Sequence, residues 1–122
     1  MDPFDRVAEI YKALAHPIRL QILQQLLLDG EACVCHLEAR LGQRQAYISQ
    51  QLAKLRQAKL VCDRRDGMNV FYSVTSDSVR EMLDQALVVA NGGAPVEVGI
   101  TVLDLPEQAD SKKCTCPMCD AP

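Results

Sequence analysis

The chain has 122 residues, a formal net charge of −3 and a hydrophobic fraction of 48%. This length fits one domain with a modest core, and no apolar run is long enough to span a membrane. The first residues, Met1 to Arg6, lack the basic start and apolar stretch of a signal peptide. We therefore expect a cytoplasmic protein with no membrane partner.

The negative net charge conceals a basic segment in the middle of the chain. Residues 40–65 contain seven Lys and Arg residues and a single acid, Asp63, so this segment has a balance of +6 and the remainder −9. A basic patch on an acidic body attracts a polyanion and also orients it. The charge pattern therefore favours a nucleic-acid partner.

Two helices are predicted before this basic segment. Apolar residues recur at helical spacing in residues 4–15 and again in residues 18–28, which read as a core helix. His16 stands between them and precedes Pro17, which pushes it away from helical angles. We interpret His16 as a helix-boundary residue rather than a ligand. The second helix should end at Gly30.

A third helical pattern reaches Leu41, and Gly42 suits the left-handed turn that follows it. In the next helix, Ile48, Leu52 and Leu55 are spaced to share one buried face. Gln can pair with a base edge, and Lys and Arg neutralise phosphates. The residues expected to contact DNA in and before this helix are Gln43, Arg44, Gln45, Tyr47, Ser49, Gln50 and Lys54.

Residues 60–74 read as two strands around an Asp66-Gly67 turn, which predicts a β-hairpin. Two helices joined by a turn and followed by a basic hairpin form the layout of a winged helix-turn-helix. We therefore predict a mainly α fold with a small β-hairpin. Arg64 and Arg65 on the hairpin are expected to touch DNA phosphates near the minor groove.

The last predicted helix is strongly apolar from Val79 to Ala90 and should end at the following Asn and two Gly residues. Ser78 and Glu81 have the spacing of a capping box, although any of the four residues from Thr75 to Ser78 could cap the helix. So apolar a helix on a small domain needs a second surface, and we expect homodimerisation through the first and last helices. Residues 1–93 form the predicted domain and residues 94–122 a tail, weakly strand-like at first.

The cysteines fall into two groups and one single residue. Cys33 and Cys35 stand where the third helix begins, and Cys62 on the hairpin reads as a small buried hydrophobe. Clustered thiolates are ligands for soft metal ions, and thiols in a reducing compartment favour this use over structural disulfides. The predicted metal ligands are Cys33, Cys35 and a CxCxxC cluster in the tail, Cys114, Cys116 and Cys119.

The spacing of Cys33 and Cys35 suggests a mechanism. In a regular helix, residues i and i+2 point about 200° apart, so binding one ion through both sulfurs should distort the start of the third helix. The distortion would reach the DNA-binding helix that follows. A helix start also favours the thiolate form of cysteine. We expect His36 to be solvated or to support the site rather than to bind the ion.

Three segments resemble the ArsR/SmtB family of winged-helix repressors: Lys12 to Leu23, Leu41 to Leu52, and Leu55 to Val61 leading into Arg64 to Gly67. The resemblance implies a homodimer that binds an operator and leaves it when a metal ion or other inducer binds. Gln43 and Arg44 depart from the usual apolar residue and Ser before the recognition helix. The operator sequence is therefore not transferred.

The segment from Cys33 to Leu37 resembles the CVCDL motif of arsenite and cadmium/lead sensors in that family, with His36 where an acid is usual. This likeness carries ligand roles to Cys33 and Cys35. The family's zinc site on the last helix is absent, because no His follows His36. The N-terminal cysteines of the cadmium sensors are also missing, and the tail cluster is a departure from the family pattern.

We therefore expect a DNA-binding repressor, not an enzyme, that a thiophilic ion releases. As(III) with three thiolates suits Cys33, Cys35 and one tail cysteine; Cd(II) or Pb(II) with four suits the count equally, and Zn(II) is a further candidate. An alternative keeps the fold but senses oxidants or reactive sulfur through a disulfide. Two others are a structural zinc clip in the tail and a thioredoxin-type enzyme at Cys116 and Cys119, which lacks the required strand and helix.

Overall fold

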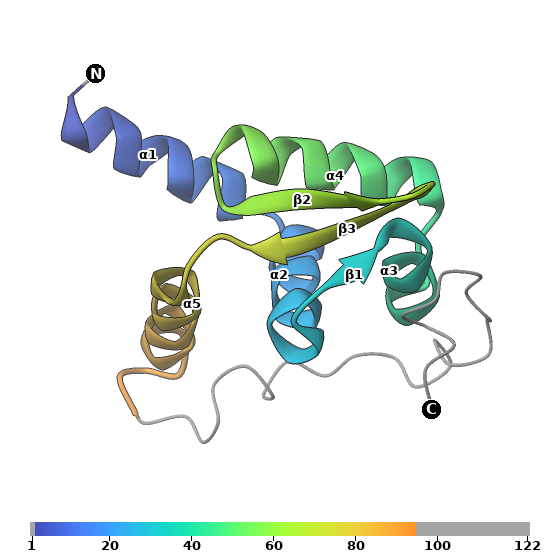
Figure 1. The fold of residues 1–122 in the computed structure, drawn as a ribbon. Helices are drawn as coiled ribbons and strands as arrows, with labels where there is room; N and C mark the ends of the chain where they lie inside the picture. The colour runs from blue at the N-terminus through green and yellow to red at the C-terminus, as the bar shows by residue number, and fades with distance from the viewer. Residues whose placement is uncertain (1, 95–122) are drawn as a thin grey trace.

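The computed structural model describes residues 2–94, and the tail with Cys114, Cys116 and Cys119 lies outside them, as do the predicted weak strand and most of residues 94–122. Five helices and three strands are described (Figure 1). The predicted winged helix-turn-helix is confirmed, with helix limits within two residues of those expected. In chain order the elements are α1 (Pro3–Leu14), α2 (Pro17–Asp29), β1 (Ala32–Cys33), α3 (Val34–Leu41), α4 (Gln45–Gln57), β2 (Val61–Asp66), β3 (Asn69–Val74) and α5 (Asp77–Ala90).

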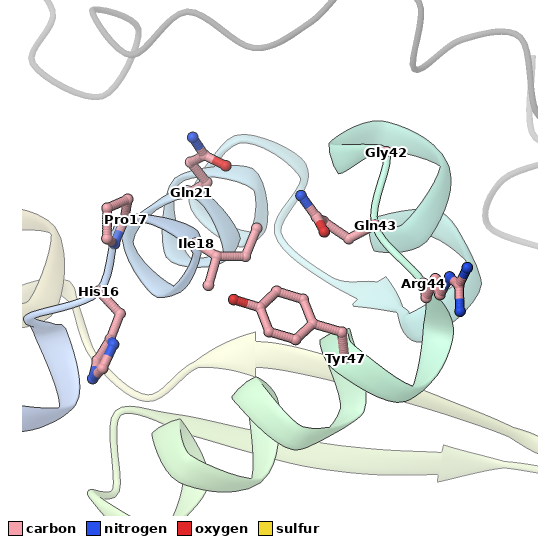
Figure 2. A pocket seen from close by; sticks show the side chains of 8 residues that line it. All are labelled: His16, Pro17, Ile18, Gln21, Gly42, Gln43, Arg44 and Tyr47. Atoms are coloured by element: carbon pink, nitrogen blue, oxygen red, sulfur yellow. The ribbon is translucent and has the colours of Figure 1, made fainter.

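The helix ends follow the local sequence. His16 is the N-cap of α2, with extended backbone (φ −143°) before Pro17 in the first turn, which confirms it as a boundary residue. Gly30 (φ 83°) ends α2 and Gly42 (φ 66°) ends α3. Both need a positive φ that glycine adopts without steric cost. The turn from α3 to α4 lies beside the start of α2 (Figure 2).

The sheet has three strands in the order β1-β3-β2, all antiparallel. The sequence indicated only the hairpin, because the two residues of β1 are too few to form a pattern. The hairpin turn also differs from the prediction: Asp66 pairs with Asn69, so Gly67 and Met68 form the turn. Gly67 has φ 65°, as expected for glycine at the first central position of a type II′ turn.

Of the four residues that could cap α5, Ser76 is the N-cap, and the capping box that begins at Ser78 is not formed. The helix begins at Asp77, and Ser76 is its N-cap, without a side-chain capping hydrogen bond. Ser78 therefore lies inside the first turn, where its hydroxyl is too far along the chain to cap. The sequence could not choose among Thr75 to Ser78 because all four side chains are suited to capping.

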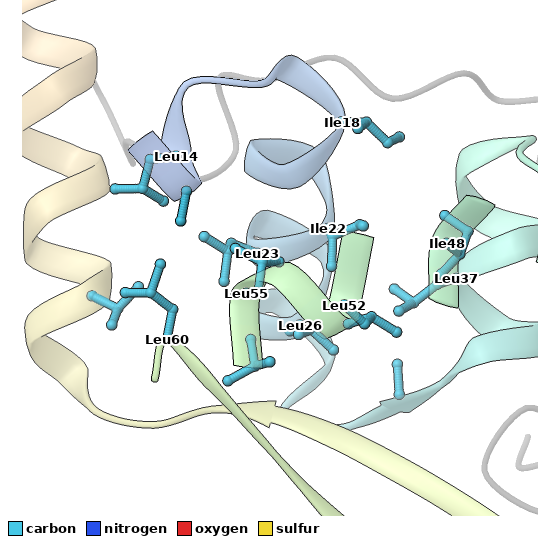
Figure 3. Packing of buried hydrophobic residues seen from close by; sticks show 14 of the residues in the cluster. Leu14, Ile18, Ile22, Leu23, Leu26, Leu37, Ile48, Leu52, Leu55 and Leu60 are labelled. Atoms are coloured by element: carbon cyan, nitrogen blue, oxygen red, sulfur yellow. The ribbon is translucent and has the colours of Figure 1, made fainter. Parts of the chain in front are cut away.

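The core lies between α2, α3 and α4 (Figure 3). Ile48, Leu52 and Leu55 are each fully buried, as their spacing predicted, and they pack in one cluster with buried residues of α2 such as Ile22 and Leu23. The position of α4 is thus fixed by apolar burial, the dominant stabilising term in a fold of this size. Among the helices of residues 2–94, none combines the length and apolar character needed to cross a membrane.

Helices α1 and α5 lie at the same end of the domain (Figure 1). A largely apolar groove of about 520 Å³ runs between them, lined among others by Tyr11, Leu14, Met82 and Val89. Tyr11 is 60% exposed and Val89 76% exposed. Each apolar helix therefore buries only part of its apolar face within one protomer.

Candidate nucleic-acid interface and thiol pair

The outward face of α4 carries small and polar side chains. Because Ile48, Leu52 and Leu55 are buried, the opposite side of the helix is exposed, and it carries Ser49 and Gln50 between two alanines, Ala46 and Ala53. Small residues leave the helix narrow enough to enter a major groove about 12 Å wide. Helix α4 contains no acidic residue, so nothing on it repels phosphate.

Arg19, which the sequence patterns did not single out, hydrogen-bonds α2 to both α1 and α4. Arg19 of α2 donates from Nε to the Gln51 side-chain oxygen at 2.8 Å and from Nη1 to the Ala13 carbonyl at 3.2 Å. These two bonds fix the start of α2 against α1 and α4. Arg19 and Gln51 lie within the segments that resemble the ArsR/SmtB family. That resemblance was the only feature of the sequence that could have identified them.

A surface pocket of about 720 Å³ adjoins the start of α4 (Figure 2). Figure 2 shows the Tyr47 ring pointing from α4 toward Ile18 of α2, while the Gln43 and Arg44 side chains lie on the α3–α4 turn. Three of the residues predicted to contact DNA, Gln43, Arg44 and Tyr47, therefore line one concave surface. Its full lining is His16, Pro17, Ile18, Gln21, Gly42, Gln43, Arg44 and Tyr47.

The side chains predicted to contact DNA are all exposed. Lys54 lies closer to the C-terminal end of α4 than the other predicted contacts and lines a second pocket with His16 and Arg19. The pockets share His16, so both border the start of α2. The exposed set is Gln43, Arg44, Gln45, Tyr47, Ser49, Gln50, Lys54, Arg64 and Arg65.

The two hairpin arginines have different surroundings. Arg64 donates from Nε and Nη2 to the two carboxylate oxygens of Glu31 at 2.9 and 2.8 Å, and its guanidinium lies 5.0 Å from the centre of the Phe71 ring. This pairing lowers the pKa of Glu31 and raises that of Arg64, through the side-chain hydrogen bond first and the opposite charge after it. Side chains alternate along a strand, so Arg65 points to the other face of β2.

The thiol pair is closer than its sequence spacing suggested. Cys33 is the last residue of β1 and the N-cap of α3, with extended backbone (φ −89°, ψ 169°), and its sulfur accepts a hydrogen bond from the His36 backbone N–H at 3.4 Å. The sulfurs of Cys33 and Cys35 lie 3.0 Å apart. The expectation that helical geometry separates them was wrong, because the helix begins after Cys33. The two sulfurs are therefore adjacent without any unwinding of the helix, and Cys35 is disulfide-bonded in this structure.

The His36 side chain connects the start of α3 to α2 through Asp29 and Gln25. Its Nε2 lies 2.7 Å from Oδ2 of Asp29, which also accepts a hydrogen bond from Gln25 Nε2 at 2.6 Å. Partial burial alone would raise the pKa of Asp29, but the hydrogen bonds to His36 and Gln25, with the charges of His36 and Arg40, lower it overall. The start of α3 is thereby tied to the end of α2.

Within residues 2–94, no group of three or more His, Cys, Asp or Glu side chains is placed to hold a metal ion. Cys33 is buried and in the thiol form, whereas Cys35 is half-buried and disulfide-bonded. A metal site at this pair would therefore need reduction of Cys35 and further ligands. The prediction that Cys62 is a buried hydrophobe was wrong. It is exposed on β2, with its sulfur 3.4 Å from Ser73 Oγ, because only Val61 of that strand reaches the core.

Comparisons with known proteins agree with this geometry. A family model described as "Bacterial regulatory protein, arsR family" matches residues 16–62. The chain is 38% identical over 89 residues to the HTH-type transcriptional regulator KmtR of Mycobacterium tuberculosis, an alignment that covers 73% of this chain and 68% of KmtR.

Two solved structures at similar identity share the fold. The homodimeric winged helix-turn-helix DNA-binding domain Mb0332 of Mycobacterium bovis has a TM-score of 0.67 and 34% identity, covering 72% of this chain and 81% of that one. Reduced HlyU from Vibrio cholerae has a TM-score of 0.61 and 38% identity, covering 70% and 88% respectively.

Proposed function

The chain belongs to the arsR family of bacterial regulatory proteins, and we propose that it is a homodimeric repressor that a thiophilic metal or metalloid ion releases from its operator. As a member of that family it is a DNA-binding transcriptional regulator and not an enzyme. The observation that carries the proposed input is the 3.0 Å separation of the Cys33 and Cys35 sulfurs. They lie at the start of α3, the helix that packs against α4.

In the proposed complex with DNA, the exposed side chains on and near α4 have two kinds of role. Ser49 and Gln50 on the outward face are suited to base edges in the major groove, while Arg44 and Lys54 are suited to phosphates. Arg65 on the hairpin extends the contact toward the adjacent minor groove. A dimer would read two half-sites about 34–36 Å apart or a multiple of that distance.

Dimerisation through α1 and α5 is supported by the groove between them. The exposed Tyr11 and Val89 side chains border it, and contiguous apolar surface on a small domain is suited to an isologous interface with a second copy. The dimer would set the distance between the two α4 helices. Operator binding and dimerisation are therefore expected to fail together.

Cys35 is disulfide-bonded in this structure, and after its reduction the two sulfurs would supply part of a thiolate site. A soft ion favours cysteine ligands, and As(III) with three or Cd(II) and Pb(II) with four would need thiolates beyond Cys33 and Cys35. The tail cysteines, Cys114, Cys116 and Cys119, are our candidates for these, from the same or the other subunit. Release then requires a coupling free energy on the order of 1–3 kcal/mol between the ion and the operator.

The short sulfur–sulfur distance also supports a second candidate input. Cys33 is in the thiol form and its sulfur lies 3.0 Å from that of Cys35, which is disulfide-bonded in this structure. The Cys33 thiolate is therefore placed for thiol–disulfide exchange, in which it forms a new bond to the Cys35 sulfur and the former partner sulfur leaves as a thiolate. The structural likeness to HlyU, whose solved form is described as reduced, favours testing this thiol-redox alternative.

The test begins with an operator selected in vitro from random duplexes by the reduced, full-length protein. Its binding is then followed by fluorescence anisotropy under anaerobic conditions during titration with As(III), Cd(II), Pb(II) and Zn(II). Release by a soft ion near one equivalent per subunit is the expected result. Release by peroxide or persulfide but by no ion would replace the metal proposal with the redox one.

A further inference from the structure

Helix α4 has two edges beside its outward face, one toward the hairpin and one toward α1 and α2. On the first edge, Arg56 pairs with Asp63 of β2 at 3.5 Å. On the second edge, Gln51 accepts a hydrogen bond from Arg19 of α2. At 3.6 residues per turn, Lys54 and Arg56 point about 200° apart, so Lys54 lies on the edge away from the hairpin. The outward face of α4 is therefore flanked by the hairpin on one side and by α1 and α2 on the other.

A concave basic surface lies along this second edge. A pocket of about 590 Å³ has in its lining three cationic side chains and one carboxylate: Lys12 of α1, Arg19 of α2, Lys54 of α4 and Glu9 of α1. The charged groups of the lining thus have a balance of +2. Lys12 and Arg19 lie outside residues 40–65, the segment whose charge predicted a nucleic-acid partner. The folded chain therefore extends the basic patch onto two helices that the charge count did not include.

The basic surface continues from this pocket toward the start of α4. His16, on the chain between α1 and α2, borders this pocket and also the pocket that Arg44 lines (Figure 2). Helix α4 has 13 residues, a length of about 20 Å at 1.5 Å per residue. One DNA strand carries a phosphate about every 3.4 Å along the helix axis. A surface of this length can follow one strand over several phosphates.

We propose that this surface, made by Lys12, His16, Arg19, Arg44 and Lys54 and called here the α1-side surface, binds the phosphate backbone on the side of the major groove opposite the hairpin. The inference rests on the proposed insertion of α4 into the major groove and adds a second backbone contact to it. Two phosphate backbones border a major groove, so a helix inserted there has one along each edge. The hairpin contacts one backbone, and the α1-side surface contacts the other.

The charged residues of the α1-side surface have different tasks. Arg19 binds Gln51 through Nε and the Ala13 carbonyl through Nη1, so it fixes α1 beside α4. Lys12 is exposed on the last turn of α1, where its flexible side chain presents a point charge to phosphate. Glu9, one turn earlier on α1, lines the same pocket and opposes the approach of phosphate. Lys12 is therefore the contact to test, and Glu9 is its natural counterpart.

The experiment measures the salt dependence of DNA binding for three α1 variants of the full-length protein. Lys12→Ala removes the proposed contact, and Glu9→Gln removes the opposing carboxylate. Arg6→Ala is the control, because Arg6 is an exposed cation of α1 outside the pocket lining. Each protein is titrated without inducer onto the selected operator and onto a random duplex of the same length, at several salt concentrations, with fluorescence anisotropy as the readout.

We expect K12A to bind both duplexes about fivefold more weakly near 0.15 M salt, with a salt slope smaller by about 0.9, the value for one lost phosphate contact. E9Q should bind both about twofold more tightly, because it loses a charge that repels phosphate. R6A should match the wild type. A damaged fold would not tighten binding in E9Q, and thermal melting checks all three variants. Loss of binding in K12A on the operator alone would overturn the backbone contact.

A second measurement locates the phosphate. Single phosphates of the operator are replaced by uncharged methylphosphonates, and each duplex is tested with the wild type, K12A and Arg65→Ala. Neutralising the phosphate that Lys12 contacts should weaken the wild type and leave K12A unaffected. This phosphate should border the major groove on the side opposite the phosphates to which R65A is insensitive. If K12A responds to every substituted duplex as the wild type does, the proposal is overturned.

The outcomes distinguish this surface from the proposed function. If K12A and E9Q bind as the wild type does, while Lys54→Ala and R65A each lose a phosphate contact, the α1-side surface is wrong and the proposed docking of α4 stands. If Lys54→Ala and R65A also keep the wild-type salt dependence, the proposed docking of α4 is wrong and the α1-side surface with it.

Discussion

The sulfur of Cys33 accepts a hydrogen bond from the backbone N–H of His36 at 3.4 Å, so this cysteine caps the helix that its own thiol pair adjoins. The same residue pairs with Phe71 in the sheet. Strand end, helix cap and proposed ligand thus coincide at one position. A substitution that tests the ligand role must therefore preserve the cap.

Serine meets that requirement at Cys33. Its hydroxyl oxygen is a good N-cap acceptor but a poor ligand for a soft ion. We expect Cys33→Ser and Cys35→Ser to bind the operator with wild-type affinity and to remain bound when As(III) or Cd(II) is added, as measured by anisotropy. Cys62→Ser is the matched control and should be released normally. Normal release of both C33S and C35S would refute the ligand assignment.

Removal of the cap itself should have a separate effect on stability. Cys33→Ala loses the side-chain acceptor and should destabilise the fold by about 0.5–2 kcal/mol relative to Cys33→Ser, the usual cost of an N-cap. Urea unfolding of the two variants measures this difference directly. Equal stability would mean that the sulfur contributes nothing as a cap.

The two kinds of polar side chain on α4 should differ in DNA binding. Gln50→Ala is expected to cost about 1–3 kcal/mol on the selected operator and to relax the preference at one base pair, because a base contact is lost. Lys54→Ala should weaken binding to all sequences and reduce the salt dependence by about one charge. Competition assays at several salt concentrations measure both. Uniform loss in Q50A would contradict the base-contact role.

A charge placed in the α1–α5 groove should separate the proposed dimer. Val89 lines the groove and is largely exposed, so Val89→Lys leaves the protomer core intact and buries a lysine only in the dimer. We expect a monomer in sedimentation analysis and at least a tenfold weaker operator complex. Glu81→Lys, on an exposed site of α5 away from the groove lining, should remain dimeric; a dimeric V89K would place the interface elsewhere.

Asp29 should contribute to the acid sensitivity of the fold. Its pKa is lowered from the ordinary value of 3.8, so during acidification the unfolded chain takes up this proton before the folded chain does. The stabilisation is complete above about pH 4–5 and is lost as the pH falls through the lowered value. Urea unfolding at pH 6 and pH 3 should therefore show a smaller loss of stability for Asp29→Asn than for the wild type. An equal loss would contradict this contribution.

Periodicity and turn residues predicted most of the fold. The spacing of Ile48, Leu52 and Leu55 predicted the buried face of α4. The opposite side of the helix was then expected to be its outward face. Gly42 gave the turn. The short strand β1 escaped prediction because a strand of two residues is stabilised by its neighbours, Tyr72 and Phe71, and not by a pattern of its own.

The site was less predictable than the fold because its geometry depends on contacts distant in the sequence. Glu31 and Arg64 are 33 residues apart, and no local pattern pairs them. The position of Cys33 outside the helix followed from β1, which was itself missed. The exposed DNA-facing residues were easier to identify because exposure on α4 follows from the same periodicity as burial.

The division of α4 into two faces has a consequence for how such a regulator can diversify. Ile48, Leu52 and Leu55 hold the helix in place, whereas Ser49 and Gln50 are exposed and contribute little to the core. Substitutions on the outward face can therefore accumulate without lowering the stability of the fold. A duplicated gene could acquire a new target sequence through a few such changes and keep its inducer.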